Sequence, residues 1–98
     1  MKAYFLFTAS SPLVILTSYD FIKNPELMEN LTAKGIGKFV ACELPLELCR
    51  EKYGQKFDTV CNNVRETDDL RVLDFSGERA FKIFKFKEMG SPIYYEPG

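Results

Sequence analysis

The chain contains no histidine and no tryptophan, and only three of its 98 residues are cysteine. Without histidine it cannot form a Ser-His-Asp or Cys-His catalytic arrangement, and it has no imidazole acid or base near neutral pH. Zinc requires closely spaced thiolates or imidazoles, and Cys42, Cys49 and Cys61 form no such pair. We therefore expect no bound metal and no cofactor, and the composition argues against an enzyme.

The chain also lacks a charge excess and a long apolar run. Its 13 basic and 14 acidic side chains give a net charge of −1, which removes the strong attraction to nucleic acid or to anionic membranes. No uncharged apolar run reaches the roughly 18 residues of a spanning helix. The apolar stretches 3–7 and 13–16 are interrupted by Ser10, Ser11 and Pro12, which predicts two strands and not a signal peptide.

The cysteine content predicts the cellular compartment. The number of cysteines is odd and no CxxC pair is present, which is typical of a reducing environment, so we predict a cytoplasmic protein. Cys61 is the thiol to test for reactivity, because it lies at the margin of an apolar helical stripe. A buried, inert cysteine is the favoured alternative, since the nearby carboxylates of Asp58 and Glu66 would disfavour the thiolate form.

What the chain does contain is the composition of a folded globular domain. Hydrophobic residues make up 46% of the sequence and nine residues are phenylalanine. A chain of 98 residues can bury one core without disulfides or metal, so we predict a single domain over 1–98. The proline- and glycine-rich segment 90–98 is expected to be an extended C-terminal tail.

The N-terminal half predicts a hairpin followed by a crossover. Segments 3–8 and 12–18 are rich in β-branched and aromatic residues and predict two paired strands. Their near-continuous apolarity indicates strands that are covered on both faces or lie in an interface. A short helix is expected to begin at Asn24 and to end at Gly35, and 38–44 is expected to return as a strand parallel to and near 12–18.

A second helical region follows Pro45. Apolar residues recur there at spacings of three and four, the period of one buried helical face. Gly54 interrupts this stripe in the form of a C-cap, so we predict two short helices that meet at Gly54, with a strand at 57–61 as the alternative. The stripe consists of Leu46, Cys49, Tyr53, Phe57, Val60 and Val64.

The segment from Glu66 to Lys87 predicts a second hairpin, with its turn at Ser76-Gly77. This register pairs opposite charges at three cross-strand positions, and it places Phe84 and Phe86 on one face of the return strand. It also places Arg71 opposite Lys82, an unfavourable pair of like charges that calls for an acid, a second subunit or a ligand between them. The alternation of lysine and phenylalanine in this strand also occurs in single-stranded nucleic-acid binders, but a core strand is the favoured explanation, because three phenylalanines at strand spacing fit a core and the overall charge is slightly negative.

The predicted fold is therefore α+β. We expect a mixed sheet of about five strands, made of the N-terminal hairpin, the crossover strand and the C-terminal hairpin, with two or three helices mainly on one face. Whether the C-terminal hairpin joins the N-terminal sheet is open at this stage.

Two functional hypotheses follow. The first is a small cytoplasmic protein-binding or regulatory module that acts through surface contacts as a homodimer, because a net charge near zero gives little repulsion between copies. Tyr94 and Tyr95 of the tail are its expected contact residues. The alternative is an anionic-ligand binding protein or an enzyme, for which charged side chains would have to converge. Those side chains are Asp20, Glu66 and Asp68 with Arg71 or Lys82.

Overall fold

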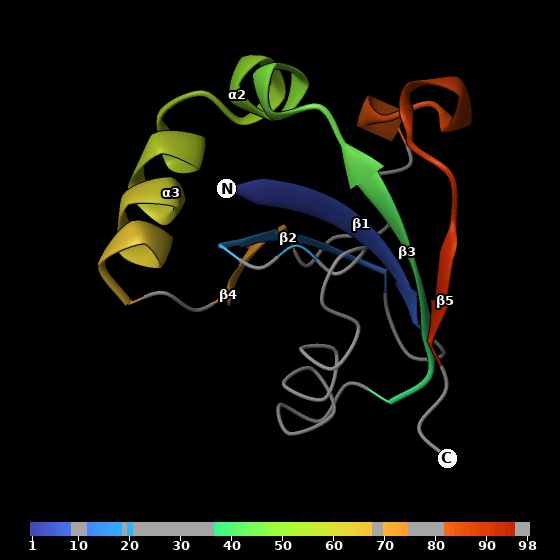
Figure 1. The fold of residues 1–98 in the computed structure, drawn as a ribbon. Helices are drawn as coiled ribbons and strands as arrows, with labels where there is room; N and C mark the ends of the chain where they lie inside the picture. Colours follow the sequence, from blue (N-terminus) through green and yellow to red (C-terminus); the bar gives the residue numbers. More distant parts are fainter. Residues whose placement is uncertain (9–11, 19, 21–36, 68–69, 75–81, 96–98) are drawn as a thin grey trace.

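The computed structural model describes residues 1–8, 12–18, 20, 37–67, 70–74 and 82–95 (Figure 1). The predicted helix from Asn24 to Gly35, the turn at Ser76-Gly77 and Asp68 lie outside these residues. The elements, in chain order, are β1 (Lys2–Thr8), β2 (Leu13–Thr17), β3 (Phe39–Leu44), α2 (Leu46–Tyr53), α3 (Gln55–Thr67), β4 (Leu70–Asp74), the 3-10 helix η2 (Phe86–Glu88) and β5 (Ile93–Tyr95).

The five strands form one sheet in the order β4-β2-β1-β3-β5. This confirms the α+β class and the five strands, but the prediction of a mixed sheet is wrong, because each neighbouring pair is antiparallel. Strands β2 and β3 run in the same direction and flank β1 on its two sides, so they are near neighbours as predicted. Strand β1 lies between β2 and β3 and is antiparallel to both. The crossover from β2 to β3 therefore joins two strands of the same direction within an antiparallel sheet.

The N-terminal hairpin is confirmed and forms the centre of the sheet. Tyr4 pairs with Ile15, and Phe5 pairs with Val14. Residues 3–6 of β1 and 14–17 of β2 are all buried. Their continuous apolarity therefore reflects burial on both faces of the sheet, as predicted.

The predicted C-terminal hairpin is wrong. Strand β4 pairs with β2, with Leu70 opposite Thr17 and Arg71 opposite Leu16. Lys82 and Ile83 have a helical backbone and Phe86–Glu88 is a 3-10 helix, so the described part of the expected return strand is not a strand. Exposed charge pairs contribute at most about 1 kcal/mol each, whereas pairing with β2 buries Leu70 and Leu73. Burial therefore decided the partner of β4.

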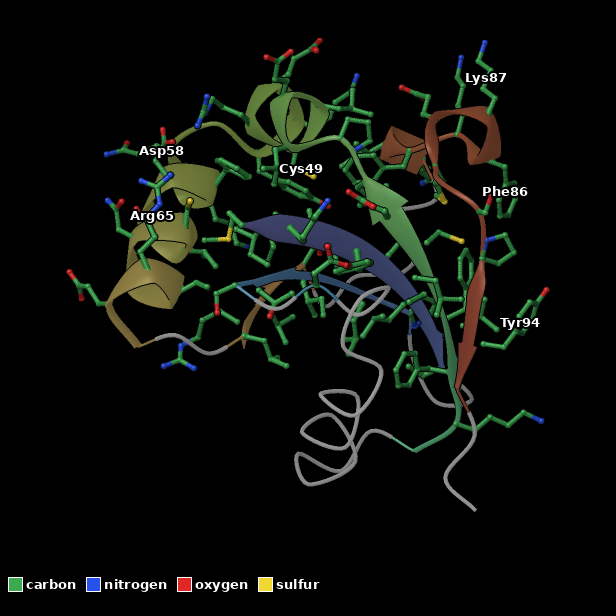
Figure 2. All side chains as sticks on the ribbon, in the orientation of Figure 1. Cys49, Asp58, Arg65, Phe86, Lys87 and Tyr94 are labelled. Carbon is green, nitrogen blue, oxygen red and sulfur yellow. The ribbon has the colours of Figure 1, made fainter. Side chains whose placement is uncertain are left out.

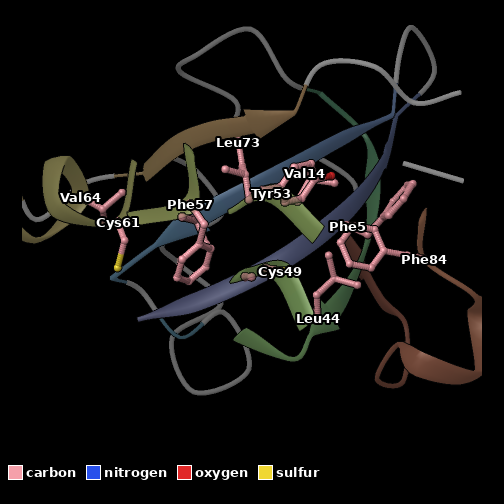
Figure 3. Close-up of a cluster of buried hydrophobic side chains, with 12 residues drawn as sticks. Phe5, Val14, Leu44, Cys49, Tyr53, Phe57, Cys61, Val64, Leu73 and Phe84 are labelled. Carbon is pink, nitrogen blue, oxygen red and sulfur yellow. The ribbon is translucent and has the colours of Figure 1, made fainter. Parts of the chain in front are cut away.

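Side chains pack on both faces of the sheet. Helix α3 contacts β4 and β2, and α2 contacts β1, so these two helices lie mainly over one half of one face (Figures 1 and 3). On the opposite face, a second cluster includes Tyr4, Leu6 and Ile15, which are fully buried. The cluster under the helices consists of Ala3, Phe5, Val14, Leu16, Leu44, Cys49, Tyr53, Phe57, Cys61, Val64, Leu73 and Phe84.

A β-bulge lies in β4 at Leu73. Val72 pairs with Ile15 and Asp74 pairs with Val14, so Leu73 is the extra residue between two consecutive pairs. A bulge changes which face the next side chain points to. Leu73 and Asp74 consequently both reach the face covered by the helices, where Asp74 is 4% exposed.

The two helices meet at Gly54, as predicted. Gly54 has φ 60° and ψ −132°, and its N–H donates to the carbonyl oxygen of Arg50 at 2.8 Å, which ends α2. Residues that carry a Cβ atom rarely adopt this backbone conformation, whereas glycine adopts it without a steric penalty. The break lets Tyr53 and Phe57 face the same cluster from two different helices.

Replacing Gly54 with alanine is expected to lower the free energy of unfolding by about 1–3 kcal/mol, because alanine at this position would have to adopt a strained backbone conformation. No heavy atom lies within 4 Å of the added Cβ, so the cost arises from conformation and not from a clash. Gly37→Ala is the control, since its added Cβ also meets no atom within 4 Å and no positive φ is involved. Urea denaturation should show a change within about 0.5 kcal/mol for this control. Equal losses of stability in the two variants would contradict the assignment of a strained backbone conformation to position 54.

In the part of the chain that the structure describes, no helix is long and apolar enough to cross a membrane.

Candidate binding site

The charged residues predicted to form a site lie on separate elements. Arg71 is on β4, where its Nη1 donates to the carbonyl oxygen of Leu70 at 3.0 Å. Lys82 is exposed and follows β4 by eight positions, so its predicted position directly opposite Arg71 is wrong. Asp20 lies beyond the end of β2, close enough to Lys2 to raise the pKa of that amine slightly, after the larger effect of Glu43. Ligand binding by these residues stays a prediction.

The predicted contact residues Tyr94 and Tyr95 lie in β5, the edge strand beside β3. Tyr94 pairs with Val40 and Tyr95 pairs with Phe39 through the backbone. Part of the expected tail is therefore a strand of the sheet. The side chain of Tyr94 is 76% exposed, and Phe86, at the start of η2, is 71% exposed. These are the large hydrophobic side chains that remain exposed in the described part of the chain.

Phe86 and Tyr94 border a groove of about 520 Å³ over β3 and β5 (Figure 2). It lies on the face of the sheet that carries α2 and α3, beside the half that these helices cover. The 3-10 helix η2 bounds the groove on one side. Its walls are mainly apolar and include Phe7, Val40, Cys42, Phe86, Met89 and Tyr94.

A row of aromatic rings connects the groove to the core. The ring centroids of Phe5 and Phe7 are 4.6 Å apart, and those of Phe7 and Phe86 are 6.0 Å apart with an interplanar angle of 14°. Phe5 is fully buried, Phe7 is half-buried and Phe86 is exposed. The buried end of the row therefore supports an exposed ring, and such ordered aromatic rings are enriched in binding surfaces.

The turn that carries Phe86 is basic. Lys85 and Lys87, on either side of Phe86, are exposed, and Lys87 points to solvent (Figure 2). Glu88 is half-buried, and its Oε1 accepts a hydrogen bond from the backbone N–H of Lys85 at 3.2 Å. Its carboxylate also borders a second hollow of about 320 Å³, together with Glu43.

Glu43 is neutralised within the fold. The Nζ of Lys2 donates to Glu43 Oε1 at 2.9 Å, and this ion pair raises the pKa of Lys2. Because Glu43 is paired with Lys2, the charge beside Phe86 comes from Lys85, Lys87 and Glu88, and two positive charges against one negative charge leave a net charge of +1.

The three thiols are buried. Cys42 lies in the floor of the groove, and burial raises the pKa of its thiol. Burial raises the pKa of Cys49 to about 12. Cys61 is 4% exposed, in agreement with the alternative of a small buried hydrophobe. Since the thiolate is the reactive form, Cys42 and Cys49 are poor nucleophiles at neutral pH.

One buried polar pair lies away from the groove. The hydroxyl of Tyr53 donates to Asp74 Oδ2 at 2.9 Å, and both side chains are buried. The ring of Tyr53 also lies against Phe84, with centroids 5.9 Å apart. This pair links α2 to the bulge of β4 and is a structural contact.

The groove contains residues that the sequence reasoning missed. It assigned Phe86 to the same buried strand face as Phe84, and it gave Phe7 and Met89 no role. The available signal was the position of Phe86 between Lys85 and Lys87 with Glu88 following, because three charged neighbours indicate a solvent-exposed segment.

The fold and this groove define a class of protein: a small α+β domain with an antiparallel five-stranded sheet and an aromatic groove at one edge. Comparison with protein-family models, with curated proteins and with solved structures gives no significant match.

Proposed function

We propose that this chain is a small cytoplasmic protein-binding or regulatory module that docks a segment of another protein in the aromatic groove. The observation that carries the proposal is the exposure of Phe86 and Tyr94, at 71% and 76%, on either side of one apolar groove. Exposed aromatic residues that border a shared hollow are typical of interface hot spots. The cytoplasmic location rests on the three free cysteines.

A protein segment suits the groove because the groove lies beside a strand edge. Among the strands that the structure describes, β5 is the last one on the side of β3, and such an edge presents backbone N–H and C=O groups to a further strand. A protein segment can use these groups and also insert a side chain into the groove. A compact small molecule would use only the groove.

A homodimer is the second candidate. It is favoured by the same edge, since two copies of β5 can pair around a twofold axis, and by the net charge of −1. An anionic-ligand site that uses Asp20, Glu66 and Asp68 with Arg71 or Lys82 is a weaker candidate, because the groove beside Phe86 and Tyr94 is lined by other residues.

Selection from a displayed library of random dodecapeptides tests the proposal. Peptides should be enriched on the wild-type protein, and their affinity should fall at least about tenfold when Phe86→Ser and Tyr94→Ser are combined. The dissociation constants can be measured by fluorescence anisotropy. Lys56→Ser on the exposed face of α3 is the control and should bind with unchanged affinity.

Two results would contradict the proposal. One is the absence of peptides whose binding depends on Phe86 and Tyr94. The other is a dimer in sedimentation equilibrium that Tyr94→Ser dissociates, because a second copy would then occupy the groove.

A further inference from the structure

The chemistry of the partner follows from the charges beside the groove and from the geometry of β5. This step rests on the proposed function, since it specifies what the groove binds. The relevant observations are the pairing of β5 with β3, the face on which Tyr94 lies and the two exposed lysines beside Phe86.

The edge strand sets the form of the partner segment. Tyr94 pairs with Val40, and both side chains line the groove, so they share one face of the sheet. A strand added to β5 would place the residue opposite Tyr94 on this same face, about 5 Å away between Cβ atoms. Every second side chain of that strand would then face the groove side, and the residues between would face the opposite side. The added segment is therefore extended and carries an apolar residue at this position.

The lysines set the charge of the partner segment. Lys85 and Lys87 flank the exposed ring of Phe86, and both are exposed. The nearest carboxylate in the same turn, Glu88, is half-buried and accepts a hydrogen bond from the chain itself. Two lysines against this one carboxylate leave a net charge of +1 on residues 85–88, which favours acidic side chains on the partner.

We propose that β5 and the groove together bind an extended, acidic segment of another protein, which adds to the sheet as an outer strand and places an apolar side chain against Phe86 and Tyr94. The backbone groups of β5 and the apolar groove provide affinity, and Lys85 and Lys87 select for acidic residues on either side of the apolar anchor. Because β5 is only three residues long, its backbone offers few hydrogen bonds, so the apolar anchor is required for binding.

The displayed dodecapeptides also test this inference. Peptides enriched on the wild-type protein should carry a net negative charge around an aromatic or aliphatic residue. The combined Lys85→Glu and Lys87→Glu variant should bind them at least about tenfold more weakly and should itself enrich basic peptides. Lys56→Glu on α3 is the matched charge reversal away from the groove and should leave the selection unchanged.

The strand addition has a separate readout. In a scan that methylates each backbone nitrogen of the best peptide, losses of affinity should recur at every second residue, because alternate N–H groups of an added strand point to β5. Enrichment of neutral or basic peptides, or losses without this period, would overturn the inference and leave the proposed function intact. If no peptide depends on Phe86 and Tyr94 and the protein instead floats with phosphatidylserine vesicles, both the inference and the proposed function fail.

Discussion

Replacing Phe84 with alanine is expected to lower the free energy of unfolding by about 3–5 kcal/mol, the usual cost of removing a fully buried aromatic ring. Phe84 is 2% exposed and belongs to the cluster beneath the helices. Its ring lies against Tyr53, so the loss would also disturb the side of α2 that faces the sheet. Urea denaturation followed by circular dichroism measures the change, with a constant m-value as the check that the denatured state is unaffected.

Phe86 provides the matched control two residues away. Phe86→Ala removes an identical ring that is 71% exposed and stacks on Phe7, so the expected loss is below about 1 kcal/mol. The predicted hairpin would place Phe84 and Phe86 on one face and would make the two variants equally destabilising. Equal losses would therefore contradict the structure described here and favour a strand in this segment.

Replacing Tyr53 with phenylalanine is expected to lower the free energy of unfolding by about 1.5–3 kcal/mol, the usual contribution of a buried hydrogen bond to a charged group. The hydroxyl of Tyr53 donates to Asp74 Oδ2 at 2.9 Å, and Asp74 is 4% exposed. Without this donor the carboxylate of Asp74 stays buried but loses a hydrogen bond that offsets part of the cost of removing it from water. The ring itself remains, so packing in the cluster is preserved.

Tyr94→Phe is the control for this hydroxyl deletion. Tyr94 is 76% exposed, so its hydroxyl can bind water in both the folded and the unfolded chain, and the change should stay within about 0.5 kcal/mol. Thermal or urea unfolding of the two variants side by side gives the comparison. A loss of stability for Tyr53→Phe no larger than that for Tyr94→Phe would show that the buried hydrogen bond contributes little.

Local patterns predicted the elements that depend on short-range chemistry. The hairpin of β1 and β2 follows from two short apolar runs, and the break between α2 and α3 follows from one glycine in a helical stripe. Burial of β1 on both faces was readable because apolar residues do not alternate with polar ones there. In each case the residues that specify the element are close together in the sequence.

The C-terminal third was predicted wrongly because its pattern fits more than one partner. Leu70, Val72 and the charges around them are compatible with a return strand at 79–87 and equally with β2, since each offers a row of apolar side chains at a period of two. The apolar area that β4 buries against β2 decides between these two partners. Strand β2 lies more than fifty positions away in the sequence. The bulge at Leu73, which turns Asp74 toward Tyr53, depends on the same long-range pairing.

The arrangement of the groove could not be predicted, for the same reason. Tyr94 was selected as a contact residue because it is an aromatic residue in a proline- and glycine-rich segment, but its neighbours in the groove come from β1, β3 and η2. The rings of Phe84 and Phe86 are chemically identical, and only the turn of the chain before η2 buries one and exposes the other.

The sequence by itself determined the α+β class, the absence of histidine, the two central apolar strands and the helices that meet at Gly54, because these properties depend on composition and on neighbouring residues. Only the tertiary structure decided which strand β4 joins, that Ile93–Tyr95 closes the other edge of the sheet and that Phe86 and Tyr94 border one groove. Those outcomes depend on burial between segments distant in the chain, and the energy of that burial cannot be assigned to any single segment.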